Sequence, residues 1–162
     1  MKKLAFILLT LLLAPGCDKR YEEGPCLSFV KAENRLCGLW SVSSMQLNEQ
    51  ERAGDTTELY RFSVFRNLEG SLYIQLTDTA GLVIAESLIR TDERLTELRF
   101  ALVTIQGYEE DSAPLFRHCP ALFGEAVWTI LRLKREEMRL RTDYAWSRVI
   151  IDFSLETDYQ HL

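Results

Sequence analysis

The chain has 162 residues and a formal net charge of −5, from 19 basic and 24 acidic side chains. Its length fits one domain of ordinary size, and its hydrophobic fraction of 47% argues against a wholly disordered chain. The acidic balance argues against nucleic acid as a partner, because phosphate binding needs clustered Lys and Arg side chains.

The first sixteen residues predict a signal peptide. Lys2 and Lys3 form a basic start, and residues 4–13 are an apolar run that a single Thr interrupts. A helix that spans a membrane needs about 20 apolar residues, so this shorter run is typical of a secretory signal rather than of a transmembrane anchor. Small residues at 14–16 then lead to Cys17, where we expect cleavage.

Cys17 is the expected point of membrane attachment. Residues 14–16 resemble a bacterial lipobox, which implies a thioether-linked diacylglycerol on Cys17. Several acyl chains hold a protein on a membrane far better than one chain does. Removal of residues 1–16 takes away two lysines and changes the net charge to −7. We expect a lipidated polar tether over residues 17–25 and a location in the bacterial cell envelope, on the outer membrane.

Residues 26–162 are expected to form one domain that begins with a short helix. The segment 27–36 carries apolar residues that would share one helical face, and Ser28 is placed to cap its N-terminus. No later segment shows a convincing period of 3.6 residues. The helix is therefore expected to precede a domain made of strands.

From residue 39 onward, apolar and polar residues alternate with the period of two that is typical of strands. Turn residues closed by Gly at 67–70 and 78–81 indicate two successive hairpins. Because closure removes exposed sheet edges, the pattern predicts an all-β, antiparallel up-and-down barrel of about eight strands. The expected strands lie around residues 39–45, 60–65, 72–77, 82–88, 97–103, 127–133, 138–141 and 148–155.

A Gly-x-Trp motif, made by Gly38 and Trp40, stands at the start of the first expected strand. It follows a Gly-Pro pair at 24–25, and a Trp-bearing hairpin lies further on at residues 128–133 and 138–140. In this setting the chain resembles lipocalin-like lipoproteins of Bacteroidetes-type bacteria. The resemblance implies a lipocalin-like barrel whose open end accepts a small apolar or amphipathic ligand.

The same resemblance implies structural roles for three residues. Gly38 would let the first strand bend, and Trp40 would pack at the closed end of the barrel beneath a cation from the last strand. Arg148 is the candidate for this cation, with Arg141 as the alternative. The competing interpretation of Trp40 is a plain core tryptophan.

Three cysteines remain once Cys17 is lipidated, namely Cys26, Cys37 and Cys119. An oxidising compartment predicts one disulfide among them, and all three pairings stay open. A pair that involves Cys119 is favoured, because it would restrict the long loop around that residue. Three buried thiols are the alternative.

The longest irregular stretch, residues 107–124, is the expected contact loop, because loops carry recognition on rigid β scaffolds. Its acidic run lacks the spaced ligands of a calcium site, and His118 and its neighbour Cys119 would point to opposite faces of a strand. We therefore expect no metal, no cofactor and no catalytic residues. The expected contact residues are Glu109, Glu110, Asp111, Phe116 and His118.

Two functions follow from these patterns. In the first, a lipid-anchored barrel holds a small apolar ligand inside. In the second, a non-enzymatic accessory protein with a solid barrel binds an envelope protein or glycan through its loops. A cavity lined by apolar side chains would favour the first, and a barrel without a void above a few water volumes would count against it. We do not expect an enzyme, because no nucleophile stands with a base and an orienting group.

Overall fold

The computed structural model describes residues 21–23, 31–51, 60–105, 120–122, 124 and 126–158. Within these ranges the chain forms one antiparallel sheet, a short α-helix and a short 3-10 helix. The elements are α2 (Ala32–Leu36), β1 (Gly38–Leu47), β2 (Gln50–Glu51), β3 (Tyr60–Arg66), β4 (Leu72–Asp78), β5 (Val83–Thr91), β6 (Glu97–Ile105), η1 (Pro120–Leu122), β7 (Val127–Leu133), β8 (Glu137–Tyr144) and β9 (Ser147–Asp158).

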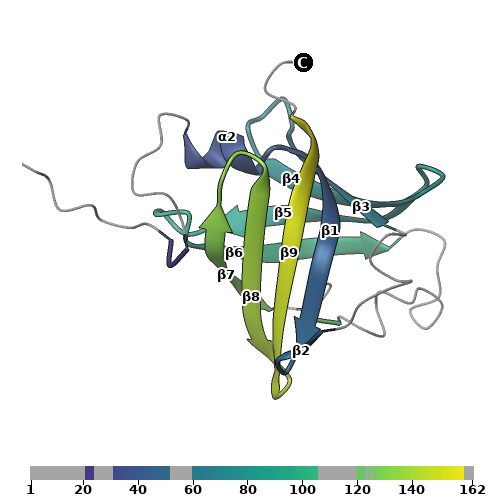
Figure 1. Ribbon diagram of the computed structural model, residues 1–162. Helices are drawn as coiled ribbons and strands as arrows, with labels where there is room; N and C mark the ends of the chain where they lie inside the picture. The colour runs from purple at the N-terminus through teal and green to yellow at the C-terminus, as the bar shows by residue number, and fades with distance from the viewer. Residues whose placement is uncertain are drawn as a thin grey trace, which may run out of the picture.

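The sheet closes on itself, because β1 pairs with β3 along one edge and with β9 along the other. Figure 1 shows β1, β8 and β9 crossing steeply in front of β3, β4, β5 and β6. The predicted all-β antiparallel barrel of about eight strands is therefore confirmed. The additional strand β2 consists of only two polar residues, Gln50 and Glu51. It therefore shows no alternation of apolar and polar residues from which a strand could be predicted.

The expected helix is confirmed in position but begins later than predicted. Among the described residues it starts at Ala32, with Lys31 at the N-cap position and no side-chain cap. Ser28, the expected cap, lies outside the described residues. No helix in the part of the chain that the structure describes has the length and apolar character needed to cross a membrane.

The two Gly-closed turns are built in the same way. Gly70 and Gly81 have φ values of 84° and 82°, a region that favours glycine. Asn67 and Asp78 open these turns, and each side chain accepts two backbone N–H groups of its own turn. Such side-chain hydrogen bonds fix the turn and so the register of the strands that it joins.

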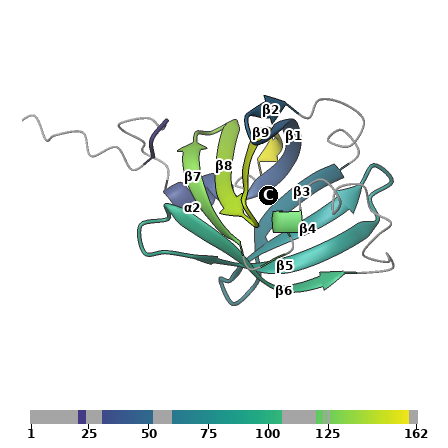
Figure 2. The same ribbon diagram turned by 90° about the horizontal axis from the view of Figure 1, so that it is seen from below.

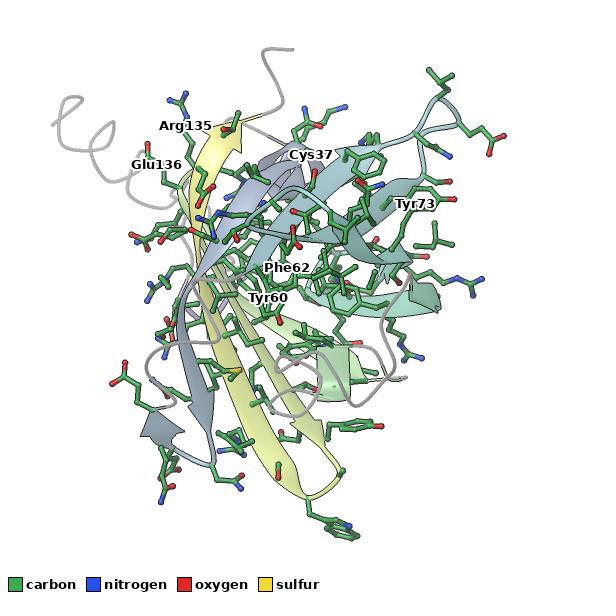
Figure 3. All side chains as sticks on the ribbon, turned by 90° about the vertical axis from the view of Figure 1, so that its right-hand side faces the viewer. Cys37, Tyr60, Phe62, Tyr73, Arg135 and Glu136 are labelled. Atoms are coloured by element: carbon green, nitrogen blue, oxygen red, sulfur yellow. The ribbon has the colours of Figure 1, made fainter. Side chains whose placement is uncertain are left out.

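Alternate residues of the strands face inward and form one continuous core. Trp40 and Trp128 are fully buried, and the Phe62 and Phe153 rings meet edge to face with centroids 5.3 Å apart. Figure 3 shows Tyr60 and Phe62 within the barrel. Large aromatic side chains therefore occupy much of the interior volume.

The helix α2 covers one end of the barrel, which we call the closed end. There the indole Nε1 of Trp40 donates a hydrogen bond of 2.8 Å to the carbonyl oxygen of Leu36. A Cβ atom on Gly38 would lie 2.8 Å from the carbonyl oxygen of Thr157. Gly38 thus permits a close approach of β1 to β9 beside the buried tryptophan.

Arg148 does not lie at the closed end, so its predicted place above Trp40 is wrong. Trp40 stands opposite Leu155 in the pairing of β1 with β9, and Arg148 precedes Leu155 by seven residues. This separation corresponds to about 23 Å along a strand. The register, which depends on closure of the whole barrel, places Arg148 at the opposite end. The alternative, Arg141, forms an ion pair with Glu22 instead, at 3.6 Å.

Candidate functional site

The mouth of the barrel, at the end opposite α2, is occupied by η1. Ala121 and Leu122 of this turn are buried in the core. Figure 2 looks onto this end, with β7, β8, β9 and β1 on one side and β3 to β6 on the other. The end of the predicted contact loop therefore packs into the barrel.

A small cavity lies beside Leu122. Its volume is about 20 Å³, which is room for about one water molecule. Pockets for small organic ligands measure about 300–1,000 Å³. The lining residues are Phe62, Ile74, Leu76, Ala85, Glu86, Ser87, Phe100 and Leu122.

The other residues of the predicted contact loop, Glu109, Glu110, Asp111, Phe116 and His118, lie outside the described residues. The end of the loop is seated against β8, because a Cβ atom on Gly124 would lie 2.9 Å from the hydroxyl oxygen of Tyr144. Tyr144 is the last residue of β8. The loop thus ends next to the β8–β9 turn.

Two hairpin turns lie side by side at this open end. Asn48 and Glu49 form the turn between β1 and β2, and Ala145 and Trp146 form the turn between β8 and β9. All four residues have positive φ values, of 50°, 67°, 49° and 68° in chain order. Two-residue turns with both φ values positive favour Asn-Gly, so Asn48 suits its place. Trp146 does not, because a bulky side chain is strained in this region.

Backbone and side-chain hydrogen bonds lock the two turns together. The Asn48 N–H donates to the Arg148 carbonyl oxygen at 2.8 Å, and the Arg148 N–H donates to the Asn48 side-chain oxygen at 2.8 Å. The Arg148 guanidinium in turn donates through Nε to an Asp143 carboxylate oxygen at 3.0 Å. These bonds fix the positions of Arg148 and Asp143 at the open end.

The two turns border an open groove of about 520 Å³, which we call the rim groove. Trp146 is fully exposed, at 105% of its reference area, whereas Trp40 and Trp128 are buried. Sequence reasoning did not single out Trp146; a tryptophan between two expected strands was its only signal. The residues of the rim groove are Asn48, Glu49, Asp143, Trp146, Ser147 and Arg148.

Three residues of the expected tether pack on the outside of β7 and β8. Tyr21 is buried, and the Arg35 guanidinium carbon lies 6.0 Å from the centre of its ring. The Glu23 N–H donates to the Leu131 carbonyl oxygen at 2.8 Å. The Glu23 carboxylate also pairs with Arg132 at 2.6 Å, so this acidic residue of the tether balances the charge of an arginine on β7.

The remaining predicted residues divide between described and undescribed parts of the chain. The Cys37 sulfur, between α2 and β1, lies 3.6 Å from the Glu33 carbonyl oxygen. Cys17, Cys26 and Cys119 lie outside the described residues, so lipidation and the disulfide stay predictions. Within the described ranges, no three His, Cys, Asp or Glu side chains are grouped as metal ligands would be.

Comparisons with known proteins show a structural likeness to solved structures. No protein-family model matches the chain, and no curated protein matches it. The crystal structure of a lipocalin-like protein from Bacteroides uniformis resembles it with 13% sequence identity and a TM-score of 0.44. The likeness covers 75% of this chain and 98% of that one. The barrel assignment itself depends on the strand pairing described above.

Proposed function

We propose that this protein is a lipoprotein of the bacterial cell envelope, anchored through Cys17, which binds a partner with the outer surface of its barrel. The observation that carries the proposal is the seating of η1 in the barrel mouth. Leu122 lines the cavity there together with Phe62 and Phe100, and the volume of that cavity is only about 20 Å³. A ligand as large as a fatty acid would have to displace η1 to bind at that place.

The packing of residues 21–23 supports a short distance between the barrel and a lipid on Cys17. Tyr21 and Glu23 are held on the barrel by the contacts given above. Four Cα–Cα steps separate Cys17 from Tyr21, and each step spans at most 3.8 Å. A lipidated protein would therefore hold the outer side of β7 and β8 within about 15 Å of the membrane surface.

The anchor is tested by replacing Cys17 with Ser in the full chain. We expect the wild-type protein to incorporate labelled palmitate and to sediment with membranes, and we expect Cys17→Ser to lose both properties. Cys119→Ser serves as the control, because it removes a cysteine that lipid anchoring does not use. A Cys17→Ser protein that stays in the membrane fraction would contradict lipid anchoring.

Binding outside the barrel is tested against the hypothesis of an internal apolar ligand. A fluorescent fatty acid is titrated into the protein, and the change in emission is followed. We expect no saturable binding, because η1 occupies the mouth. Saturable one-to-one binding that Ala85→Leu abolishes would place an apolar ligand in the cavity and overturn the proposal, since Ala85 lines that cavity.

A further inference from the structure

We propose that the rim groove is a carbohydrate-binding site in which a sugar ring stacks on the indole of Trp146. The inference rests on the proposed function, because it names the class of partner that the outer surface recognises. It is carried by Trp146, which neither core packing nor turn geometry explains. The side chain is fully exposed, and its backbone has φ of 68° in a turn that favours glycine.

The polar groups around Trp146 match the chemistry of a sugar. Glu49 and Asp143 provide carboxylate oxygens that accept hydrogen bonds from hydroxyl groups, and Arg148 provides N–H donors. A sugar ring has an apolar C–H face, which fits an aromatic ring, and a rim of hydroxyls that both donate and accept. Aromatic walls with a few placed polar groups are typical of small-molecule sites.

Hydrogen bonds within the protein already hold the polar groups of the rim groove in place without a ligand. Asn48 forms two hydrogen bonds with the backbone of Arg148, and Asp143 accepts one from its guanidinium. Among the described residues this side-chain bond uses one of the five guanidinium N–H groups and leaves others for a ligand. Groups that are already fixed lose less conformational entropy on binding.

The charges and position of the groove favour a sugar over a lipid surface. Two carboxylates and one guanidinium line it, so an anionic headgroup would meet net negative charge. Arg139 and Arg141, which bind Glu23 and Glu22 of the tether segment, precede Tyr144 by five and three residues. These separations are about 17 and 10 Å along β8, and Trp146 lies in the turn beyond Tyr144. The tryptophan therefore lies away from the surface that the tether holds.

The test uses the exposure difference among the three tryptophans. Iodide in solution is expected to quench Trp146 fluorescence, whereas Trp40 and Trp128 are buried and shielded. The full chain without its lipid is titrated with soluble oligosaccharides of glucose, xylose, mannose and N-acetylglucosamine. We expect at least one of them to protect Trp146 from iodide in a saturable way.

Binding is then measured by calorimetry for three variants. Trp146→Ala and Trp146→Gly are expected to weaken affinity at least about tenfold, as loss of a central aromatic contact does. Trp146→Gly also removes the backbone strain, so a loss of binding in a more stable protein would not reflect unfolding. Leu68→Ala is the control, because Leu68 is an equally exposed apolar residue on another turn.

Three results would overturn the carbohydrate site: no oligosaccharide protects Trp146, the Trp146 variants bind as tightly as the wild type, or phosphatidylglycerol vesicles protect Trp146 instead. None of these results would show that a fatty acid binds inside the barrel. They would therefore contradict the carbohydrate site and leave the two tests of the proposed function, the Cys17 variant and the fatty-acid titration, unaffected.

Discussion

Gly38 shows how one missing side chain permits the barrel to close. A Cβ atom there would lie 2.5 Å from a methyl carbon of Leu155 and 2.8 Å from the carbonyl oxygen of Thr157. The leucine side chain can rotate away, but the carbonyl can move only with the backbone of β9. We expect Gly38→Ala to lower the free energy of unfolding by about 1–3 kcal/mol, the usual cost of overpacking.

Urea unfolding measures this loss. Ser43→Ala is the matched control, because Ser43 is an exposed residue of the same strand. It should change the free energy of unfolding by less than about 0.5 kcal/mol. Equal stability of the Gly38→Ala protein and the wild type would show that the contact with Thr157 is relieved at no cost.

Asp92 organises the turn between β5 and β6 through its carboxylate. One oxygen accepts the N–H groups of Thr96 and Glu97 at 2.6 and 2.8 Å, and the other accepts the Thr96 hydroxyl at 2.8 Å. Desolvation raises the pKa of Asp92, but these hydrogen bonds together lower it further, so its pKa lies below 3.8. The ionised form is therefore the one that the fold stabilises.

This direction fixes the sign of a pH effect. A carboxylate with a lowered folded-state pKa contributes stability above its unfolded pKa of about 3.9, and the contribution is lost as the pH falls through the folded value. We expect Asp92→Asn to be destabilised relative to the wild type at neutral pH and the difference to shrink below about pH 4. Urea unfolding across this range, with Glu93→Gln as control, measures it. A difference that is constant with pH would contradict the assignment.

At the scale of the element, we expect backbone strain in the turn to lower the stability of the β8–β9 hairpin. Ala145 and Trp146 occupy positions that favour Asn-Gly. Each strained residue costs on the order of 1–3 kcal/mol. Replacing the pair with Asn-Gly should therefore raise the free energy of unfolding by at least about 1 kcal/mol.

Thermal and urea unfolding of the double variant Ala145→Asn/Trp146→Gly measure this gain. The single variant Ala145→Asn is expected to gain less, because it leaves the bulky residue in place. If the double variant were no more stable than the wild type, the turn would carry no strain, and the case for a use of Trp146 outside the barrel would weaken.

The strands and the Gly-closed turns were predictable because their signals are local. The alternation around Phe62 and Leu76, and the turn residues before Gly70 and Gly81, depend only on neighbouring residues. The β8–β9 turn has no Gly, Asn or Pro, so no turn chemistry marks its position. Its tryptophan therefore looked like any core aromatic in a strand-rich chain.

The position of Arg148 could not be derived from sequence for a different reason. Its place depends on how far β9 slides along β1, and two irregularities shift that register, between Leu39 and Trp40 and between Val42 and Ser44. These shifts arise from packing of the closed barrel. The rim groove is likewise a product of closure, because it joins a turn after β1 to a turn before β9.

At the scale of the whole molecule, aromatic side chains fill the part of the barrel interior that lies next to η1. Phe62 lines the small cavity and meets Phe153 edge to face. We expect Phe62→Ala to lower the free energy of unfolding by about 3–5 kcal/mol. The enlarged apolar cavity should also bind benzene, so that benzene raises the melting temperature of the variant more than that of the wild type.

Phe65→Ala provides the matched control on the same strand. Phe65 is half-buried and stacks on Tyr73 at 6.0 Å between ring centres, on the outer face. Phe65→Ala should lower the free energy of unfolding by less than Phe62→Ala does, and it should create no cavity that binds benzene. Similar losses for the two variants would mean that the interior packs no more tightly than the surface.

The pairing of β1 with β9 has a consequence for the order of events during folding. The ladder joins Gly38 to Asp158, so contacts that complete the sheet span most of the domain. Folding slows as contacting residues lie further apart in sequence. Until the twelve residues of β9 are available, both β1 and β8 present unpaired edges. A chain still being synthesised can therefore form hairpins but not a stable domain, and the last strand determines when the barrel becomes resistant to proteases.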